Sequence, residues 1–407
     1  MRLLFAHDHR FLTGPSGAVY TVGSFPRSVW QRYLGHFDHI TVIARNGGEA
    51  PLDCQLARSD LPAVRFLLVE KYSAAERLLS LPGLAANLIA EQLTMADAVV
   101  ARLPSDLGNL AAVMASRRGL PWAGEAVGCA ADGYGNHGST LARLYAPLAK
   151  HRMRKVTRQA DQMLYVTRQF LQQRYPGPPG SVGVSDVEVA TLSNDDEIGR
   201  EIRFAQLKNG MTPVFGTIAS LRVMSKGIQD ALTAIARLRA NGMAPTYRVL
   251  GAGDPEPWKA RARAVGVEEL VHFDGSRPAG ASVRAWLSTI DVHLQPSYQE
   301  GLPRATVEAM SRGCACLGST AGGLPELLPS ERLHDPGDHA TLARLMTNLI
   351  VHPERIEEAA HRDLRFSMQF QAAKLDPVRH RFYAELANRS RNHRHMQSTR
   401  ASEAAPR

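Results

Sequence analysis

Short β-rich runs alternate with longer helical patterns along this chain, and that rhythm limits its possible folds more than any other feature. In the first half the runs fall at Leu3 to His7, His39 to Arg45, Ala63 to Val69, Ala98 to Arg102 and Met163 to Thr167. Segments with helical spacing separate them. The alternation is typical of βαβ units and predicts an α/β fold with a doubly wound parallel sheet.

The same rhythm starts again after residue 211, in the runs PVFGTIAS, TYRVLGAG, VHF and DVHLQPS. A chain of 407 residues is longer than one hydrophobic core usually serves. The sequence therefore predicts two α/β domains, each with its own parallel sheet.

Changes in polarity set the expected domain boundaries. We predict a first domain over residues 1–193, a polar surface linker over 194–210 and a second domain over 211–365. A carboxyl-terminal helix over 366–387 is expected to pack back on the first domain. Residues 388–407 contain five Arg and one Glu and almost nothing apolar, which predicts a disordered basic tail.

Composition excludes several classes of protein. Hydrophobic residues make up 44% and charged residues 21%, which argues against a disordered chain or a fibrous repeat. The four cysteines have neither zinc-site spacing nor the density of a disulfide framework, so a reducing compartment is expected. We find no signal peptide pattern and no apolar run long enough to span a bilayer. The formal net charge of +9 fits nucleic acid, an anionic membrane or phosphorylated ligands.

The most informative stretch runs from Asp291 to Leu328, where a strand leads through a glycine-containing loop into a helix opened by Pro303. The unpaired amides of a helix start, with the helix dipole, attract an anion such as phosphate. Glu300 precedes this helix and Glu308 lies more than one turn inside it, so both carboxylates can face one ligand. A carboxylate beside a phosphate site is a suitable acceptor for sugar hydroxyls.

Glu300 and Glu308 within EGLPRATVEAM, followed by AGGLPE, resemble the carboxyl-terminal domain of retaining glycosyltransferases of family 4. That family has the GT-B fold, in which two Rossmann-like doubly wound parallel-sheet domains face a central cleft. The resemblance implies transfer of a sugar from a UDP- or GDP-linked donor with retention of configuration. The donor is a co-substrate, and no cofactor is expected. The structural alternative is that both glutamates decorate a solvated helix start.

The resemblance also implies roles for the residues of this motif. Glu308 would hold the ribose hydroxyls of the nucleotide, and Glu300 would hold hydroxyls of the donor sugar. The backbone of Gly301, Leu302 and Pro303 would cradle the diphosphate. Catalysis would then consist mainly of positioning and of electrostatic stabilisation of the departing diphosphate.

The segment from Gly216 to Gly227 resembles the first strand and glycine-rich turn of the same domain, with Lys226 at the position of a diphosphate-binding lysine. Ser220 stands where many members have an arginine, and Arg222 is the nearby cation. VLGAGDP, which contains Gly251, resembles the next strand and turn. No Asp-x-Asp sequence occurs in the chain, so we expect a reaction without a metal ion.

The amino-terminal half matches the family more loosely. Gly14 and Gly17 follow the first strand and would let the backbone approach a ligand in the cleft, although a plain flexible loop is the alternative. In WAGEAVG the strand ends near Glu125, with no histidine where many members have one. We predict that Asp132 or His137 serves in its place and that Glu125 lies on the acceptor side of the cleft.

Two further groups are candidates. His7, Asp8 and His9 end the first strand, and ligands in open α/β sheets bind beyond the carboxyl ends of strands. The segment Lys150 to Arg158 is a basic helix that could adsorb to anionic lipid, as in family members with lipid-linked acceptors. A solvated basic surface is the alternative.

These observations favour a glycosyltransferase that extends a glycan or a lipid-linked glycan in cell-surface or exopolysaccharide biosynthesis. It is expected in the cytoplasm, at the inner face of the plasma membrane. A GT-B epimerase or hydrolase, and a non-catalytic nucleotide-sugar or glycan-binding partner, remain alternatives. No nucleic acid partner is expected, because no recognition motif accompanies the basic residues.

Overall fold

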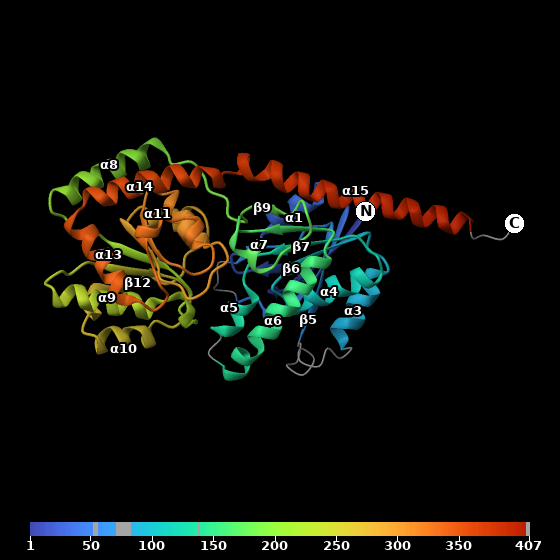
Figure 1. Cartoon of the computed structure of the whole chain (residues 1–407), viewed down its shortest axis with the longest axis horizontal. Coiled ribbons are helices and arrows are strands. Elements are labelled where there is room, and N and C mark those ends of the chain that lie inside the picture. The colour runs from blue at the N-terminus through green and yellow to red at the C-terminus, as the bar shows by residue number, and fades with distance from the viewer. Residues whose placement is uncertain (52–55, 71–82, 137–138, 404–407) are drawn as a thin grey trace. The chain divides into compact units, whose positions relative to one another are not determined.

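The computed structural model describes residues 1–51, 56–70, 83–136 and 139–403 (Figure 1). They form two compact units. The first contains Met1–Ala131, Ala146–Val184 and the chain from Asp376. The second contains Asp132–Tyr145 and Ser185–Leu375. The described part of the chain contains no helix that is both long and apolar enough to cross a membrane.

A nine-stranded sheet forms the centre of the first unit. Its main path runs β4-β2-β1-β6-β7-β8-β9, with β3 paired to β1 and β5, and every pairing is parallel except those of β2. The strands are β1 (Arg2–Thr13), β2 (Val19–Thr21), β3 (His39–Glu49), β4 (Ala57–Arg58), β5 (Val64–Val69), β6 (Ala98–Leu103), β7 (Trp122–Ala126), β8 (Gln162–Tyr165) and β9 (Val182–Gly183). The helices of this half of the chain are α1 (Arg27–Leu34), α3 (Leu84–Leu93), α4 (Asp106–Arg117), α5 (Ala130–Gly135), α6 (Thr140–Gln159) and α7 (Phe170–Arg174).

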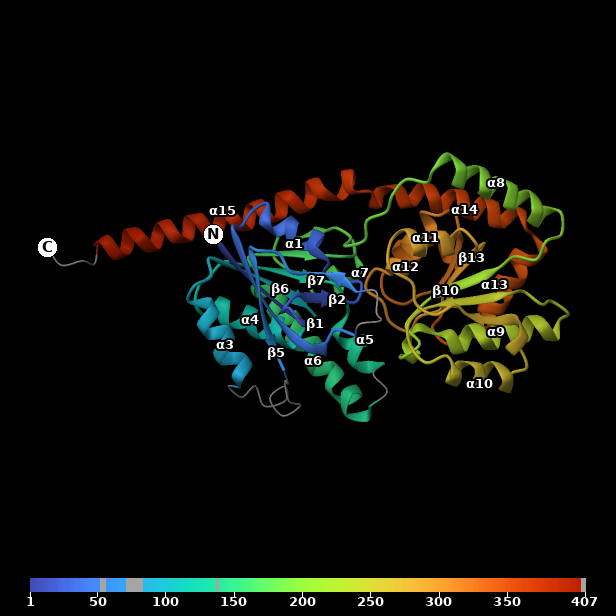
Figure 2. The same cartoon turned by 180° about the vertical axis from the view of Figure 1, so that it is seen from behind.

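The second unit is built on a six-stranded sheet in the order β12-β11-β10-β13-β14-β15, and all of its pairings are parallel. The strands are β10 (Phe215–Ile218), β11 (Tyr247–Leu250), β12 (Val271–Phe273), β13 (Val292–Gln295), β14 (Ala315–Ser319) and β15 (Leu333–His334). The helices are α8 (Asn194–Lys208), α9 (Ile228–Ala240), α10 (Glu256–Ala264), α11 (Ala281–Leu287), α12 (Arg304–Met310), α13 (His339–Val351) and α14 (Glu354–Ser367). Figures 1 and 2 place α9 and α10 on one side of this sheet and α8, α11 and α14 on the other.

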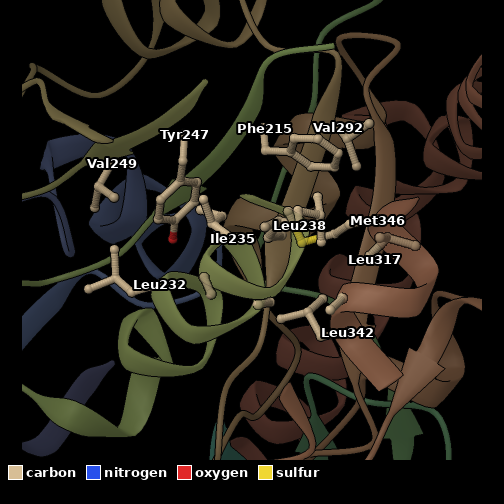
Figure 3. Close-up of a cluster of buried hydrophobic side chains, with 14 of the residues drawn as sticks. Phe215, Leu232, Ile235, Leu238, Tyr247, Val249, Val292, Leu317, Leu342 and Met346 are labelled. Carbon is tan, nitrogen blue, oxygen red and sulfur yellow. The ribbon is translucent and has the colours of Figure 1, made fainter. Parts of the chain in front are cut away.

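Burial on both sheet faces explains why the strands are almost continuously apolar. In β1 the run from Leu3 to Ala6 is at most 1% exposed, as expected of a central parallel strand. In the second unit α9 presents Leu232, Ile235 and Leu238 at helical spacing to the strand residues Phe215 and Tyr247 (Figure 3). The predicted α/β class with two parallel sheets is confirmed.

The linker predicted over residues 194–210 is instead helix α8, which belongs to the second unit. Ser193 caps it by accepting a hydrogen bond from the backbone N–H of Asp196. Arg200, Phe204 and Leu207 are buried at helical spacing. The segment is polar because the remaining residues of an amphipathic surface helix face solvent.

The tail predicted to be disordered over residues 388–407 is part of helix α15 (Ala372–Glu403) as far as it is described, and residues 404–407 lie outside the described part. Ser390 is buried and its hydroxyl donates to the Leu386 carbonyl. The helix expected over residues 366–387 is divided, because α14 ends at Ser367 and a 3₁₀ turn (Met368–Phe370) precedes α15. The first unit includes the chain from Asp376.

Candidate functional site

The loops that follow β10 and β13 interlock at the carboxyl ends of these adjacent strands. Gly227 has a positive φ of 73°, and a Cβ atom there would lie 1.8 Å from the Pro296 carbonyl oxygen. The backbone N–H of Tyr298 donates to the Ser225 carbonyl oxygen at 2.8 Å. Only glycine permits this close approach, which holds the turn containing Lys226 against the loop containing Glu300.

Loops from β11 and β14 complete the same surface. A Cβ atom on Gly251 would lie 1.7 Å from the Ala219 carbonyl oxygen, so the turns after β10 and β11 abut. Gly322 has a φ of 62°, and a Cβ atom there would lie 2.4 Å from the Glu300 carbonyl oxygen. Four neighbouring parallel strands thus end at one loop cluster, the usual position of a ligand site in an open α/β sheet.

Glu300 lies at the centre of this cluster. Its Oε1 atom accepts hydrogen bonds from Lys226 Nζ at 2.6 Å, Ser297 Oγ at 2.7 Å and Gln295 Nε2 at 3.0 Å. Its side chain is 8% exposed. All three donors meet one oxygen, and among the described residues Oε2 accepts no hydrogen bond. The carboxylate is therefore fixed in orientation with one oxygen available to a ligand.

Glu308 is partly buried on α12. Burial raises the pKa of its carboxyl, while the positive charges of Arg304 and Arg284 oppose that rise. A partly buried carboxyl under the influence of two positive charges is suited to accept hydrogen bonds from ligand hydroxyls. The helix begins at Arg304, so Pro303 is its N-cap and not its first residue as predicted.

The other predicted donor-site residues are divided between the loop cluster and the core. Ser220 and Arg222 are exposed in the loop after β10, and the backbone N–H of Arg222 donates to Ser220 Oγ at 3.3 Å. Gly216 lies within β10, where a Cβ atom would be 2.8 Å from the Ile290 side chain. A glycine is therefore required at position 216 by close packing against Ile290. Gly216 is not a ligand-binding residue as predicted.

Glu125 is not on an open surface, contrary to the sequence prediction. It is 1% exposed on β7. Its Oε1 atom accepts from Tyr33 Oη at 2.6 Å and Tyr383 Oη at 2.8 Å, and its Oε2 atom accepts from Arg102 Nη1 at 2.8 Å. Both oxygens are thus occupied within the core of the first unit, which leaves none for an acceptor.

Gly14 and Gly17 form the tight turn between β1 and β2. Gly17 N–H donates to the Gly14 carbonyl at 2.9 Å, and Gly17 has a φ of 73°. Asp132 is partly buried on α5. Asn136 directly follows α5. Its Nδ2 group donates to the Tyr298 carbonyl oxygen at 3.3 Å, and both residues belong to the second unit. His137 lies outside the described residues.

His7, Asp8 and His9 lie within β1, which continues to Thr13, and do not end the strand as predicted; their partners are mainly structural. Asp8 accepts the backbone N–H groups of Asp106 and Leu107 and so caps α4. His9 Nε2 lies 2.7 Å from the Thr21 hydroxyl. Burial lowers the pKa of His9 to about 4, and burial lowers the pKa of His7 well below its ordinary value. Both imidazoles are therefore neutral at pH 7.

Helix α6 contains the predicted basic segment together with an exposed apolar stripe. Its buried residues are Ala149, Met153, Val156 and Thr157. Three leucines at spacings of three and four residues face solvent, with exposures of 62%, 74% and 45%: Leu141, Leu144 and Leu148. Farther along the helix His151, Lys155 and Arg158 are exposed. The helix contains no Asp or Glu.

Sequence reasoning missed Gln295 and Ser297 as partners of Glu300. Their signal is the alternation of polar residues along an otherwise buried strand, because residues two apart on a strand share one face. Among the described residues no group of three or more His, Cys, Asp or Glu side chains could hold a metal ion.

Residues 212–352, which include the whole loop cluster, match the family model described as Glycosyl transferases group 1. Over these residues the chain is similar to glycosyl transferases group 1. It is 28% identical to Protein CapJ of Staphylococcus aureus over 364 residues, 88% of each chain. It is 32% identical to the amylovoran biosynthesis glycosyltransferase AmsK of Erwinia amylovora over 134 residues, which cover 30% of this chain and 33% of AmsK.

Solved structures with the same fold include sucrose-phosphate synthase from Thermosynechococcus elongatus, with a TM-score of 0.68, 15% identity and coverage of 95% of this chain and 99% of that one. Anabaena HepE in complex with UDP-glucose has a TM-score of 0.64, 16% identity and coverage of 95% and 100%. WaaG, a glycosyltransferase involved in lipopolysaccharide biosynthesis, has a TM-score of 0.62, 17% identity and coverage of 94% and 99%. The fold of this chain is therefore GT-B.

Proposed function

We propose that this glycosyltransferase moves a sugar from a UDP- or GDP-linked donor to a glycan or lipid-linked glycan, with retention of configuration, in cell-surface or exopolysaccharide biosynthesis. The observation that supports this most strongly is Glu300, which Lys226 contacts at 2.6 Å within a cluster of glycine-dependent loops. The relatives named for amylovoran and lipopolysaccharide biosynthesis support the pathway. The complex of HepE with UDP-glucose supports a nucleotide-sugar donor.

Each residue of the loop cluster would bind a different part of the donor. Glu308 would accept hydrogen bonds from the ribose hydroxyls, and Glu300 Oε2 would accept them from the donor sugar. The backbone from Gly301 to Pro303 would lie against the diphosphate. Lys226 would turn from Glu300 to the diphosphate, with Arg222 as a second cation, since a lysine stem has the freedom to exchange partners.

In the proposed reaction the bond between the anomeric carbon and the diphosphate oxygen breaks, and the nucleoside diphosphate leaves. The acceptor hydroxyl oxygen forms its bond to the same face of the anomeric carbon, and its proton passes to the departing diphosphate. Lys226 and Arg222 would stabilise the charge that develops on the leaving group. Asp132 and His137 are the candidates for contact with the sugar.

A donor panel tests this proposal. Purified protein is incubated with UDP-, GDP- and ADP-sugars, with and without lipid-linked acceptors, and the released nucleoside diphosphate is measured. We expect acceptor-dependent release from one donor class, and an α-linked product from an α-linked donor. Because two cations are proposed to replace a metal ion, release should persist in EDTA. Release without acceptor would indicate a hydrolase, and binding without turnover would indicate a non-catalytic partner.

We also propose that α6 holds the enzyme at the cytoplasmic face of an anionic membrane, where lipid-linked acceptors lie. The solvent-facing stripe of Leu141, Leu144 and Leu148 followed by cations has the composition of an interfacial helix. Co-sedimentation with vesicles containing 30 mol% phosphatidylglycerol should fall at least fivefold in the variant Leu144→Ser/Leu148→Ser. Equal binding to vesicles of phosphatidylcholine alone would contradict the electrostatic part of this proposal.

A further inference from the structure

One face of β13 and of the segment directly after it presents polar side chains in the interior of the second unit. His293, Gln295 and Ser297 follow one another at a spacing of two residues, and none is more than 1% exposed. Buried polar groups cost free energy unless they are paired, so such a row requires a reason beyond core packing. The row leads directly to Glu300.

The hydrogen bonds of this row have a defined direction. Burial lowers the pKa of His293 to about 4, so its imidazole is neutral at pH 7 and has a single N–H. His293 Nδ1 has no partner, whereas Nε2 lies 3.1 Å from Gln295 Oε1. Because an amide oxygen only accepts, the ring proton belongs on Nε2, which donates to Gln295.

That bond fixes the amide of Gln295. With Oε1 held by His293, the Nε2 group of Gln295 faces the other way and donates to Ser297 Oγ at 2.8 Å and to Glu300 Oε1 at 3.0 Å. Ser297 Oγ in turn donates to Glu300 Oε1 at 2.7 Å. A reversed amide would direct an oxygen at a carboxylate, so the histidine specifies the orientation that Glu300 needs.

We propose that His293 and Gln295 are positioning residues for sugar transfer and act by holding Glu300 in the orientation that leaves Oε2 for the donor sugar. This inference rests on the proposed function. In that function Lys226 leaves Glu300 for the diphosphate, and one of the three donors to Oε1 is lost at the moment of reaction. Gln295 and Ser297 then hold the carboxylate alone, and His293 keeps Gln295 in register.

The test compares Gln295→Met and His293→Met, which remove the donating groups, with His293→Gln, whose side-chain amide restores an N–H donor. For each variant kcat and the KM of the donor are measured by nucleoside diphosphate release, and the Kd of UDP or GDP by calorimetry. We expect kcat to fall at least tenfold in both Met variants, with the nucleotide Kd within twofold of the wild type. His293→Gln should recover kcat to within threefold.

Tyr247→Phe is the matched control, because it also removes a buried hydrogen bond in the same sheet, from Tyr247 Oη to Thr217 Oγ1 at 2.8 Å. It should lower the melting temperature about as much as Gln295→Met but leave kcat within twofold. In a Glu300→Ala background Gln295→Met should cause no further loss of kcat, because it acts only through Glu300. Ser297→Ala provides a second route if Gln295→Met does not fold.

Three results would overturn the inference. One is a kcat for Gln295→Met equal to that of Tyr247→Phe, another is an additional tenfold loss in the Glu300→Ala background, and the third is no recovery in His293→Gln. A wild-type protein without turnover on any donor and acceptor would overturn the proposed function together with the inference. Normal wild-type turnover with an unaffected Gln295→Met would overturn the inference alone.

Discussion

Glu125 in the first unit and Glu300 in the second are both glutamates at the carboxyl ends of parallel strands, and each has three hydrogen-bond donors. The donors of Glu125 occupy both of its oxygens. Those of Glu300 all meet a single oxygen. The number of hydrogen bonds is therefore the same, and their distribution over the two oxygens differs.

The difference separates a carboxylate that stabilises a core from one that, in the proposed function, keeps an oxygen for the donor sugar. The two phenols and the guanidinium around Glu125 satisfy a buried charge completely, and burial together with that charge raises the pKa of both Tyr33 and Tyr383. Glu300 is bounded instead by glycine turns that bring backbone close to it. Distribution of donors, more than burial, distinguishes the two roles.

The largest expected effect is on stability in the first unit. Glu125→Ala should lower the free energy of unfolding by about 3 to 5 kcal/mol, because it removes the buried carboxylate that pairs with Arg102 and accepts from two buried phenols. Urea denaturation followed by circular dichroism measures the loss. The exposed Glu331→Ala serves as a control and should change stability by less than about 0.5 kcal/mol. Equal losses of unfolding free energy in the two variants would show that Glu125 does not stabilise the first unit.

Glu300→Gln should lower kcat by about a hundredfold, which corresponds to roughly 2.7 kcal/mol of transition-state stabilisation. The amide retains the size of the side chain but loses the charge, so the melting temperature should change little. Nucleoside diphosphate release under saturating donor gives kcat, and scanning calorimetry gives stability. The comparison between the two glutamates would fail if Glu300→Gln unfolded the protein or left kcat intact.

A smaller effect is expected for the phenols of the first unit. Tyr383→Phe removes one donor to Glu125 and should cost about 1.5 to 3 kcal/mol, the range for a hydrogen bond to a charged group. Tyr33→Phe should cost a similar amount, and the double variant should show coupling because both phenols share Oε1. Urea denaturation of the three variants measures this. Strict additivity would show that the phenols act independently.

The last prediction concerns the loss of stability in acid to which His9 contributes. The folded pKa of His9 is about 4 against an ordinary value of 6.5, so the unfolded state binds a proton first as pH falls. Stability should decrease from about pH 7 toward pH 4, by at most about tenfold in the unfolding equilibrium per pH unit for this group, and should not change above pH 7. His9→Gln should weaken this dependence in melting curves at pH 7 and pH 5. An unchanged slope would show that other groups dominate.

The sequence predicted the two parallel sheets well because their strands are buried on both faces and are therefore nearly continuous apolar runs. The family resemblance also assigned Lys226 and Glu300 to one donor-binding site, and the two side chains are in contact. The linker over 194–210 was predicted wrongly because a surface helix with few buried residues, such as Phe204 and Leu207, has a polar composition.

The environment of Glu125 could not be read from the sequence. Two of its partners come from residues far away along the chain, and nothing near Glu125 indicates that a tyrosine at position 383 will reach it. The same limit applies to position 216, where the Ile290 side chain leaves no room for a Cβ atom and no ligand is needed to explain the glycine. Local patterns predict the strand on which a residue lies, whereas long-range packing decides whether its side chain is free.

The first unit is assembled from three separate segments, and the last begins at Asp376. During synthesis Glu125 leaves the ribosome 258 residues before Tyr383 does. The Glu125 carboxylate therefore lacks its hydrogen bond from Tyr383 until the whole of the second sheet has been synthesised. All strands of the second sheet are synthesised before residue 376, so the second unit can fold before the first unit has its last segment. The unit whose synthesis begins first is therefore the last to have its complete chain.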